Sequence, residues 1–116
     1  MENMKDLGFN KNEDNMNLLI GELKHHLSNS SLGGGKKSIE KHKQKGKLTA
    51  KERIYTLIDS KTEFLEIGSL AAMDMYKEYG GCNSAGVLIG IGTIHNKKCM
   101  IVANDATVKA GAWFPM

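Results

Sequence analysis

The chain has 116 residues, a formal net charge of +3, and charged and apolar fractions of 25% and 41%. These values are typical of a globular domain, and the length allows one domain at most or a piece of one. The sequence has no run of about 18 consecutive apolar residues, so no membrane span is expected.

The N-terminal segment, residues 1–32, is predicted to be a loose end followed by a helix. Residues 1–11 are polar and mixed, as chain ends often are. From about Asn12 to Asn29 the apolar side chains recur at helical spacing: Met16, Leu19, Ile20, Leu23 and Leu27. One amphipathic helix therefore occupies this part of the chain.

The central segment, residues 33–60, is basic and is predicted to be helical, with a first helix over residues 36–47. Gly33-Gly34-Gly35 precedes two lysines, but the Lys-Ser/Thr pair of a phosphate-binding loop is absent, so a flexible break between helices is the favoured interpretation. Between Lys36 and Arg53 there are eight basic residues and two acidic ones. This pattern suggests an anionic partner such as nucleic acid or a phosphorylated ligand, with a solvated helical face as the alternative.

A second helix start is predicted within this basic segment. Thr49 and Glu52 have the spacing of a capping box, in which each side chain bonds the backbone N–H of the other residue. Ile54, Leu57 and Ile58 then predict a short buried stripe that ends at residues 59–60.

The C-terminal segment, residues 61–116, is predicted to form a sheet. Residues 64–67 read as a brief strand, and two apolar runs, 87–94 and 99–103, predict a hairpin around a turn at 95–97. Both runs are so uniformly apolar that burial on both faces is expected. The covering layers such a sheet needs are not supplied by this sequence, and the ending at Pro115-Met116 reads as a truncation.

Two cysteines, Cys82 and Cys99, lack the spacing of a metal site. Cys99 lies in an apolar strand and is predicted to be a core residue, because a free cysteine behaves as a small hydrophobe. No signal peptide is recognisable, so reduced thiols and a cytoplasmic location are expected.

The usual side-chain signatures of catalysis are absent from the sequence. Gly90-Ile91-Gly92 lies within a strand and has no helix after it, so it is not a dinucleotide fingerprint. What remains is the loop Lys109-Ala110-Gly111-Ala112, whose small residues allow backbone N–H groups to approach a developing oxyanion. From the residues alone, a plain turn is the favoured interpretation of this loop.

Two stretches carry a family resemblance. The first is GGGKKSIEKHKQKGKLTAKERI, residues 33–54, followed by LIDS and FLEI; the second is residues 86–115, ending in MIVANDATVKAGAWFP. Together they resemble the N-terminal part of the carboxyltransferase (beta) subunit of biotin-dependent acyl-CoA carboxylases, and the second stretch is most similar to the methylcrotonyl-CoA carboxylase branch. The resemblance covers about residues 15–116 with its motifs in order.

The resemblance implies an α/β fold in which N-terminal helices lead into the start of a crotonase-like (ClpP/crotonase) ββα superhelix, truncated here. It implies transfer of a carboxyl group from carboxybiotin to an acyl-CoA, either 3-methylcrotonyl-CoA or propionyl-CoA. Biotin would be carried by a partner, a biotin carboxylase or biotin carboxyl carrier subunit, with none bound by this chain. The carboxyltransferase subunits would form a homo-oligomer, in the mitochondrial matrix if the source is eukaryotic, with no nucleic acid or membrane partner.

The resemblance also assigns site residues. The backbone N–H of Ala110 would be one of two catalytic donors to the thioester oxygen, with Lys109, Gly111 and Ala112 binding substrate and no metal. The family often has glycine at this position, and the second donor would lie beyond Met116. The lysines of residues 36–53 would lie near the CoA phosphates. The chain alone would be inactive; the competing hypotheses are a small basic polyanion-binding (nucleic-acid-binding) module and a fragment that docks on intact subunits.

Overall fold

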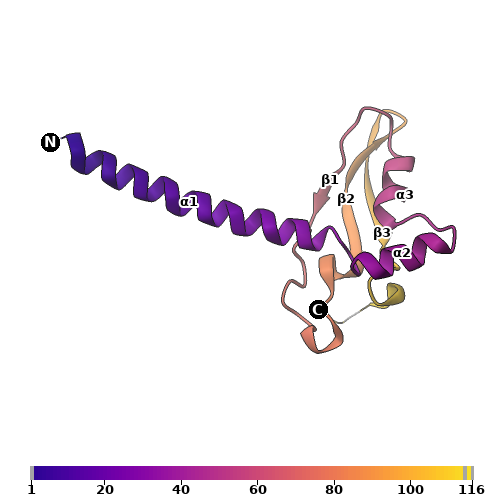
Figure 1. The fold of residues 1–116 in the computed structure, drawn as a ribbon. Helices are drawn as coiled ribbons and strands as arrows, with labels where there is room; N and C mark the ends of the chain where they lie inside the picture. Colours follow the sequence, from indigo (N-terminus) through magenta and orange to yellow (C-terminus); the bar gives the residue numbers. More distant parts are fainter. Residues whose placement is uncertain (1, 114, 116) are drawn as a thin grey trace.

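The structure, a computed structural model, describes residues 2–113 and 115. Its helices and strands are, in chain order, α1 (Glu2–Ser30), α2 (Lys36–Gln44), α3 (Ala50–Leu57), β1 (Leu65–Ile67), β2 (Val87–Ile94) and β3 (Lys97–Asn104). Short 3-10 turns occur at η1 (Lys77–Tyr79), η2 (Asn83–Gly86) and η3 (Lys109–Gly111). The strands form an antiparallel sheet in the order β1-β2-β3 (Figure 1).

Helix α1 projects away from the rest of the chain (Figure 1). The predicted loose end at residues 1–11 is wrong from Glu2 onward, because the helix begins there and runs for 29 residues. The projection gives a radius of gyration of 18.6 Å, against roughly 13 Å for a compact chain of this length. The apolar side chains of α1 are largely exposed, including Met16, Leu19 and Leu23.

The base of α1 is tied to the segment before β2. The hydroxyl of Ser30 donates to the carbonyl of Ser69 and contacts the hydroxyl of Ser84 at 2.9 Å. The side-chain amide of Asn83 donates to the carbonyl of Gly33 at 2.8 Å. The same amide donates at 3.4 Å to the carbonyl of Asn29, one of those that the end of α1 leaves without a helical partner. These bonds place the glycine run 33–35 beside the segment that leads into β2.

The β2–β3 hairpin has a tighter turn than predicted. Ile94 pairs with Lys97, so the turn consists of His95 and Asn96 and not of three residues. Both turn residues have positive φ, 48° and 61°, which is the conformation that two-residue hairpin turns need to match the strand twist. The second strand therefore begins two residues earlier than the apolar pattern indicated.

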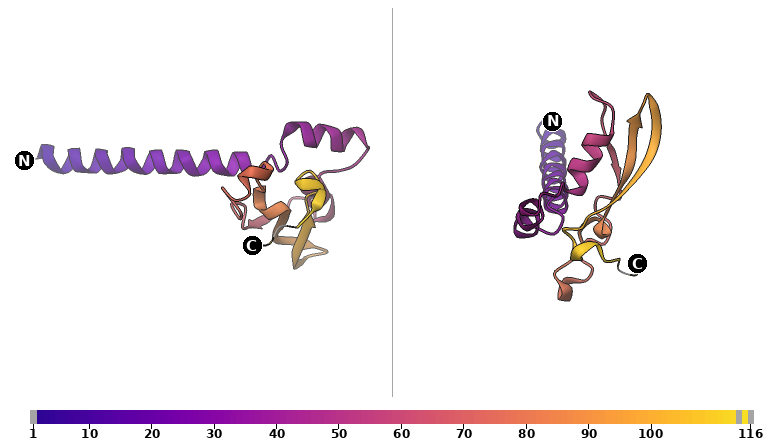
Figure 2. Two further views of the ribbon diagram at one scale, coloured as in Figure 1. Left: turned by 90° about the horizontal axis from the view of Figure 1, so that it is seen from below. Right: turned by 90° about the vertical axis from the view of Figure 1, so that its right-hand side faces the viewer.

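The core lies between α3 and one face of the sheet. All three helices lie on this side of the hairpin (Figure 2, right). The buried residues of the core are Ala50, Ile54, Ile58, Ile101 and Ala103, with Phe64, Leu88 and Ile94 packed around them. Two predictions about buried residues are wrong. Leu57 is 53% exposed, because α3 turns this position away from the sheet. Cys99 is only partly buried, whereas Cys82 is buried and its thiol pKa is raised by that burial.

The opposite face of the sheet is open in the part of the chain that the structure describes. Its exposed large apolar side chains come from all three strands: Leu65, Ile67, Ile89, Met100 and Val102. The sequence predicts burial of both faces of the sheet. Within residues 2–113 and 115 only the face that contacts α3 is buried. The reason is that α3 packs on β2 and β3 from one side, and none of the described elements packs on the other.

The two glycines in β2 allow this packing. A Cβ atom added at Gly90 would lie 2.4 Å from Cζ of Phe64, and one added at Gly92 would lie 2.7 Å from Cγ2 of Ile58. Neither distance is possible for a real side chain, so the Gly-x-Gly pattern reflects close approach of neighbouring side chains and backbone.

Candidate functional site

The loop after β3 begins with a tightly bonded turn. Oδ1 of Asp105 accepts a hydrogen bond from the N–H of Thr107 at 2.9 Å and one from its hydroxyl at 2.6 Å. The N–H of Asp105 donates to the carbonyl of Gly86 at 2.9 Å, which ties the turn to the start of β2. Asp105, Thr107 and Val108 are all buried. An aspartate that bonds the backbone two residues ahead in this way fixes a turn without help from a helix or sheet.

The glycine run between α1 and α2 packs against the same turn. The N–H of Gly34 donates to Oγ1 of Thr107 at 3.1 Å. A Cβ atom at Gly34 would lie 1.7 Å from the carbonyl oxygen of Thr107, so only glycine fits. The predicted break between helices is confirmed, but its flexibility is not the reason for the glycines. They permit a close contact between two segments 73 residues apart.

The turn leads into η3, which carries the predicted oxyanion donor. Gly111 and Ala112 donate their N–H groups to the carbonyls of Val108 and Lys109, at 2.9 and 3.0 Å. Ala110 has a left-handed conformation, φ 55° and ψ 24°, which is uncommon for a residue with a Cβ atom. Within residues 2–113 and 115, the Ala110 N–H has no hydrogen-bond acceptor and is not part of the β-sheet ladder.

Ala110 and Lys109 border a cavity of about 440 Å³. The glycine runs 33–35 and 80–81 form much of its wall, together with Asn83 and Thr107. Gly111 and Ala112 do not line it, so the structure brings two of the four predicted site residues, Lys109 and Ala110, to the cavity. A wall rich in glycine exposes backbone N–H groups, which are the kind of donor that an oxyanion site needs.

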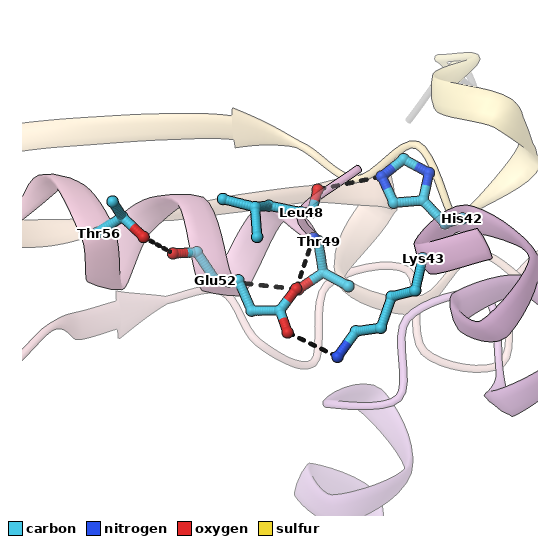
Figure 3. A network of polar contacts seen from close by, with 6 residues as sticks. All are labelled: His42, Lys43, Leu48, Thr49, Glu52 and Thr56. Carbon is cyan, nitrogen blue, oxygen red and sulfur yellow. Dashed lines mark hydrogen bonds and ion pairs between the residues drawn. The ribbon is translucent and has the colours of Figure 1, made fainter. Parts of the chain in front are cut away.

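The basic segment is held by a network at the start of α3 (Figure 3). The predicted capping box is confirmed: Oγ1 of Thr49 accepts from the N–H of Glu52, and the Glu52 carboxylate accepts from the N–H of Thr49 at 2.8 Å. Nζ of Lys43 lies 2.6 Å from Oε1 of Glu52. Lys43 and then Thr49 lower the pKa of Glu52 to about 2. Lys43 is therefore paired within the chain.

A second cavity, of about 410 Å³, lies between the base of α1, one side of α2, the N-terminal part of α3 and the sheet. Its lining has both signs of charge: the basic residues are Lys43 and Lys51, and the acidic ones are Glu52, Glu66 and Asp105. The cavity that Ala110 borders is also lined by Ser38 of α2 and by Lys109. Lys47 and Arg53 line a separate cavity, and the position of the lysines of residues 36–53 near the CoA phosphates stays a prediction.

Residues 2–113 and 115 contain neither a candidate metal centre nor a candidate membrane span. No group of three or more His, Cys, Asp or Glu side chains there is placed to hold a metal ion. None of the helices in the same residues combines the length and the apolar character that crossing a bilayer requires.

Sequence reasoning did not identify Asp105 and Thr107 as part of the site, although they hold the loop that carries Ala110. A usable signal was present. Asn104-Asp105-Ala106-Thr107 follows directly on a strand, and an aspartate two residues before a threonine is a pattern for a side-chain-bonded turn. The partner segment, Gly33-Gly34, lies too far away in sequence for such a pattern to reveal it.

Comparison with known proteins identifies the class of protein that this loop and sheet belong to. Residues 41–116 match the model of the carboxyl transferase domain, which is more than half of the chain. The chain belongs to the carboxyl transferase domain family. The predicted kinship with biotin-dependent acyl-CoA carboxylase beta subunits is confirmed at this level.

Among individual relatives, the chain is 44% identical over 102 residues to the mitochondrial methylcrotonoyl-CoA carboxylase beta chain of Dictyostelium discoideum, covering 88% of the chain and 17% of the relative. It is 42% identical over 98 residues to the beta1 subunit of the biotin-dependent 3-methylcrotonyl-coenzyme A carboxylase of Mycobacterium tuberculosis, covering 84% and 18%. The chain thus spans less than a fifth of the length of these relatives.

The structure is similar to that of transcarboxylase 12S, solved as a hexamer with methylmalonyl-coenzyme A and methylmalonic acid bound. The TM-score is 0.73 at 28% sequence identity, and the match covers 84% of this chain and 19% of that one. This confirms the predicted fold class: the helices and antiparallel sheet are part of a crotonase-like α/β carboxyltransferase fold.

Proposed function

We propose that the chain is the N-terminal part of the carboxyltransferase subunit of a biotin-dependent acyl-CoA carboxylase. The complete subunit would transfer a carboxyl group from carboxybiotin to an acyl-CoA. We favour 3-methylcrotonyl-CoA as the substrate, with propionyl-CoA as the second choice. Two observations support the first choice: the relatives named for that substrate are 42% and 44% identical to the chain, and the stretch GAWFP belongs to the part that most resembles them.

The observation that carries the proposal is the Ala110 N–H. It lies at the end of the loop after β3, on the wall of a cavity, and has no acceptor among the residues that the structure describes. A free N–H donor beside a cavity is what an acyl-CoA carboxyltransferase needs at its thioester oxygen. Val108, Gly111 and Ala112 use their N–H groups within the loop, whereas Lys109 and Ala110, which both border the cavity, have no backbone acceptor among the described residues. We propose Ala110 as the donor that this loop offers to a substrate.

The chemistry of carboxyl transfer explains why such a donor matters. The acyl-CoA must become an enolate, or its vinylogue, before its carbon attacks the carboxyl group. The thioester oxygen then carries more negative charge than it does in the bound substrate, so a fixed N–H donor stabilises the enolate more than the ground state and lowers the barrier. Lys109, Gly111 and Ala112 are proposed as substrate-binding residues around this donor, and a second donor would come from another part of the complete subunit.

Carboxybiotin enters this scheme as a co-substrate attached to a partner, a biotin carboxylase or biotin carboxyl carrier subunit. The proposal assigns it no residue of this chain. The complete subunit would assemble with copies of itself, by analogy with the hexamer of transcarboxylase 12S. A mitochondrial location in a eukaryotic source, or a cytoplasmic one in a bacterium, belongs to the same proposal, and the Dictyostelium relative is mitochondrial by name.

The test is incorporation of labelled bicarbonate into acyl-CoA by the complete subunit together with its biotin-carrying partner. We expect 3-methylcrotonyl-CoA to be carboxylated faster than propionyl-CoA, and the 116-residue chain alone to be inert. Equal or greater activity on propionyl-CoA would contradict the substrate choice, and transfer by the chain alone would contradict its assignment as a part. Titration of the chain with CoA and with duplex DNA tests the alternative, since a polyanion-binding module would bind DNA with a steep salt dependence and show no preference for CoA.

A further inference from the structure

We propose that Thr107 is a positioning residue for the Ala110 N–H, acting through its side-chain hydroxyl. The inference rests on the proposed function for its catalytic consequence, but its structural basis is independent of that function. Thr107 belongs to neither the predicted donor nor the predicted substrate-binding residues. It lies three positions before Ala110, in the turn that connects β3 to η3.

The Thr107 hydroxyl is bonded on both sides. It donates to Oδ1 of Asp105 at 2.6 Å and accepts the N–H of Gly34 at 3.1 Å. The residue is 7% exposed, and so is Asp105. A buried hydroxyl that turned away would leave itself and both of its partners without hydrogen bonds, which costs free energy. Asp105 and Gly34 therefore hold the Thr107 side chain in one orientation.

These bonds connect the loop to two distant parts of the chain. Gly34 lies at the junction of α1 and α2, and its missing Cβ allows the backbones to come into contact. The N–H of Asp105 donates to Gly86 at the start of β2. The turn that contains Thr107 is therefore fixed both to the helical junction and to the sheet.

From this fixed turn, a series of backbone bonds continues to the donor. The N–H of Val108 bonds the carbonyl of Asp105 at 3.1 Å, and the N–H of Gly111 bonds the carbonyl of Val108 at 2.9 Å. The peptide that carries the Ala110 N–H lies inside the second of these turns. Its position therefore follows the position of Thr107. A shift of about 1 Å in a catalytic group can cost as much as 100-fold in rate.

The experiment compares Thr107→Val, which keeps the shape and removes the hydroxyl, with Thr107→Ser, which keeps the hydroxyl. Thr56→Val is the matched control, because the Thr56 hydroxyl bonds only the carbonyl of Glu52 on the exposed side of α3. In the 116-residue chain, NMR measures hydrogen exchange of the Ala110 and Gly111 amides. In the complete carboxylase, steady-state kinetics gives kcat and KM for the acyl-CoA.

We expect Thr107→Val to increase the exchange rate of the Gly111 amide, to change the Ala110 amide shift, and to lower kcat by roughly 10- to 100-fold with KM nearly unchanged. Thr107→Ser should restore both readouts, and Thr56→Val should leave them as in the unsubstituted protein. A Thr107→Val enzyme with unchanged kcat and unchanged amides would overturn the proposal. So would equal losses in the Val and Ser variants.

The two readouts separate this inference from the proposed function. If the complete protein transfers no carboxyl group, the proposed function fails, and the amide measurements still decide whether Thr107 holds the loop. If Thr107→Val does not fold, Asp105→Asn replaces it, since the amide retains an acceptor oxygen but loses the charge that strengthens the bond to the hydroxyl. A partial increase in Gly111 exchange would then support the inference, and unchanged exchange would contradict it.

Discussion

The carboxylate of Asp59 accepts a hydrogen bond from the backbone N–H of Asn96 at 2.8 Å, although the two residues are 37 positions apart. Its other oxygen accepts the N–H of His95, also at 2.8 Å. Asp59, two residues beyond the end of α3, thus bonds both N–H groups of the hairpin turn. This contact links the helix to the far end of the sheet and favours the positive φ angles of the turn.

Replacing Asp59 should loosen the hairpin turn before it affects the core. In Asp59→Ala, the N–H groups of His95 and Asn96 lose their acceptors, so both amides should exchange faster with solvent, whereas the Ile101 amide in the middle of β3 should change little. Hydrogen exchange measured by NMR provides the test. Asp59→Asn retains an acceptor oxygen, so its exchange rates at residues 95 and 96 should lie between those of the unsubstituted chain and those of Asp59→Ala. Unchanged exchange at residues 95 and 96 in the alanine variant would show that the contact is not formed in solution.

The capping box at the start of α3 should contribute measurably to stability. Thr49→Ala removes the acceptor for the N–H of Glu52, and loss of such a cap typically costs about 1 kcal/mol. Urea denaturation should show a lower midpoint with an unchanged slope. Thr49→Ser keeps the hydroxyl and is the matched control. An alanine variant as stable as the unsubstituted chain would mean that α3 is held by its packing on the sheet alone.

The same network predicts a dependence of stability on acid. The pKa of Glu52 is lowered to about 2 by Lys43 and Thr49, so the folded state binds a proton at this carboxyl less readily than the unfolded state does. Its stabilising contribution is complete above the unfolded value of 4.5 and is lost as pH falls toward 2. The difference in melting temperature between the unsubstituted chain and Glu52→Gln should therefore shrink from pH 5 to pH 2. A difference that stays constant over this range would contradict the ion pair with Lys43.

Local sequence signals predicted much of this fold. The capping box, the helix over residues 12–29 and the hairpin were all readable, because each depends on residues within a few positions of one another. The contacts that shape the site were not readable in this way. Gly34 meets Thr107, and Gly90 meets Phe64, only after the chain has folded. A glycine in a sequence therefore indicates either a flexible backbone or a close approach, and the sequence alone does not distinguish the two.

The role of Gly90 can be tested by adding a single methyl group. In Gly90→Ala the Cβ atom would lie 2.3 Å from the carbonyl oxygen of Leu65 and 2.4 Å from Cζ of Phe64, so overpacking should destabilise the fold by about 1–3 kcal/mol. Gly21→Ala is the control, since nothing lies within 4 Å of that position in α1. Alanine should stabilise that helix by roughly 0.5–1 kcal/mol. Chemical denaturation gives the free energy of unfolding of both variants. A similar change in this free energy at the two positions would rule out a specific close contact at Gly90.

The reaction should depend on the backbone N–H of Ala110 and not on its methyl group. A left-handed alanine costs about 1–2 kcal/mol, and glycine removes that cost while losing about 0.4–1 kcal/mol through the greater freedom of the unfolded chain. Ala110→Gly should therefore be slightly more stable and should keep the activity of the complete carboxylase, because the N–H donor is retained. A large loss of kcat in this variant would indicate that the methyl group, and not the amide, serves the reaction.

The most direct test of the account removes the Ala110 N–H and keeps the alanine side chain. Replacing Ala110 with lactic acid in the complete subunit exchanges the amide for an ester, which keeps the methyl group and the chain path but has no donor. If this N–H stabilises the enolate oxygen, kcat should fall roughly 100- to 1,000-fold while KM for the acyl-CoA changes little. An ester enzyme that transfers carboxyl groups at the rate of the amide enzyme would contradict the central claim.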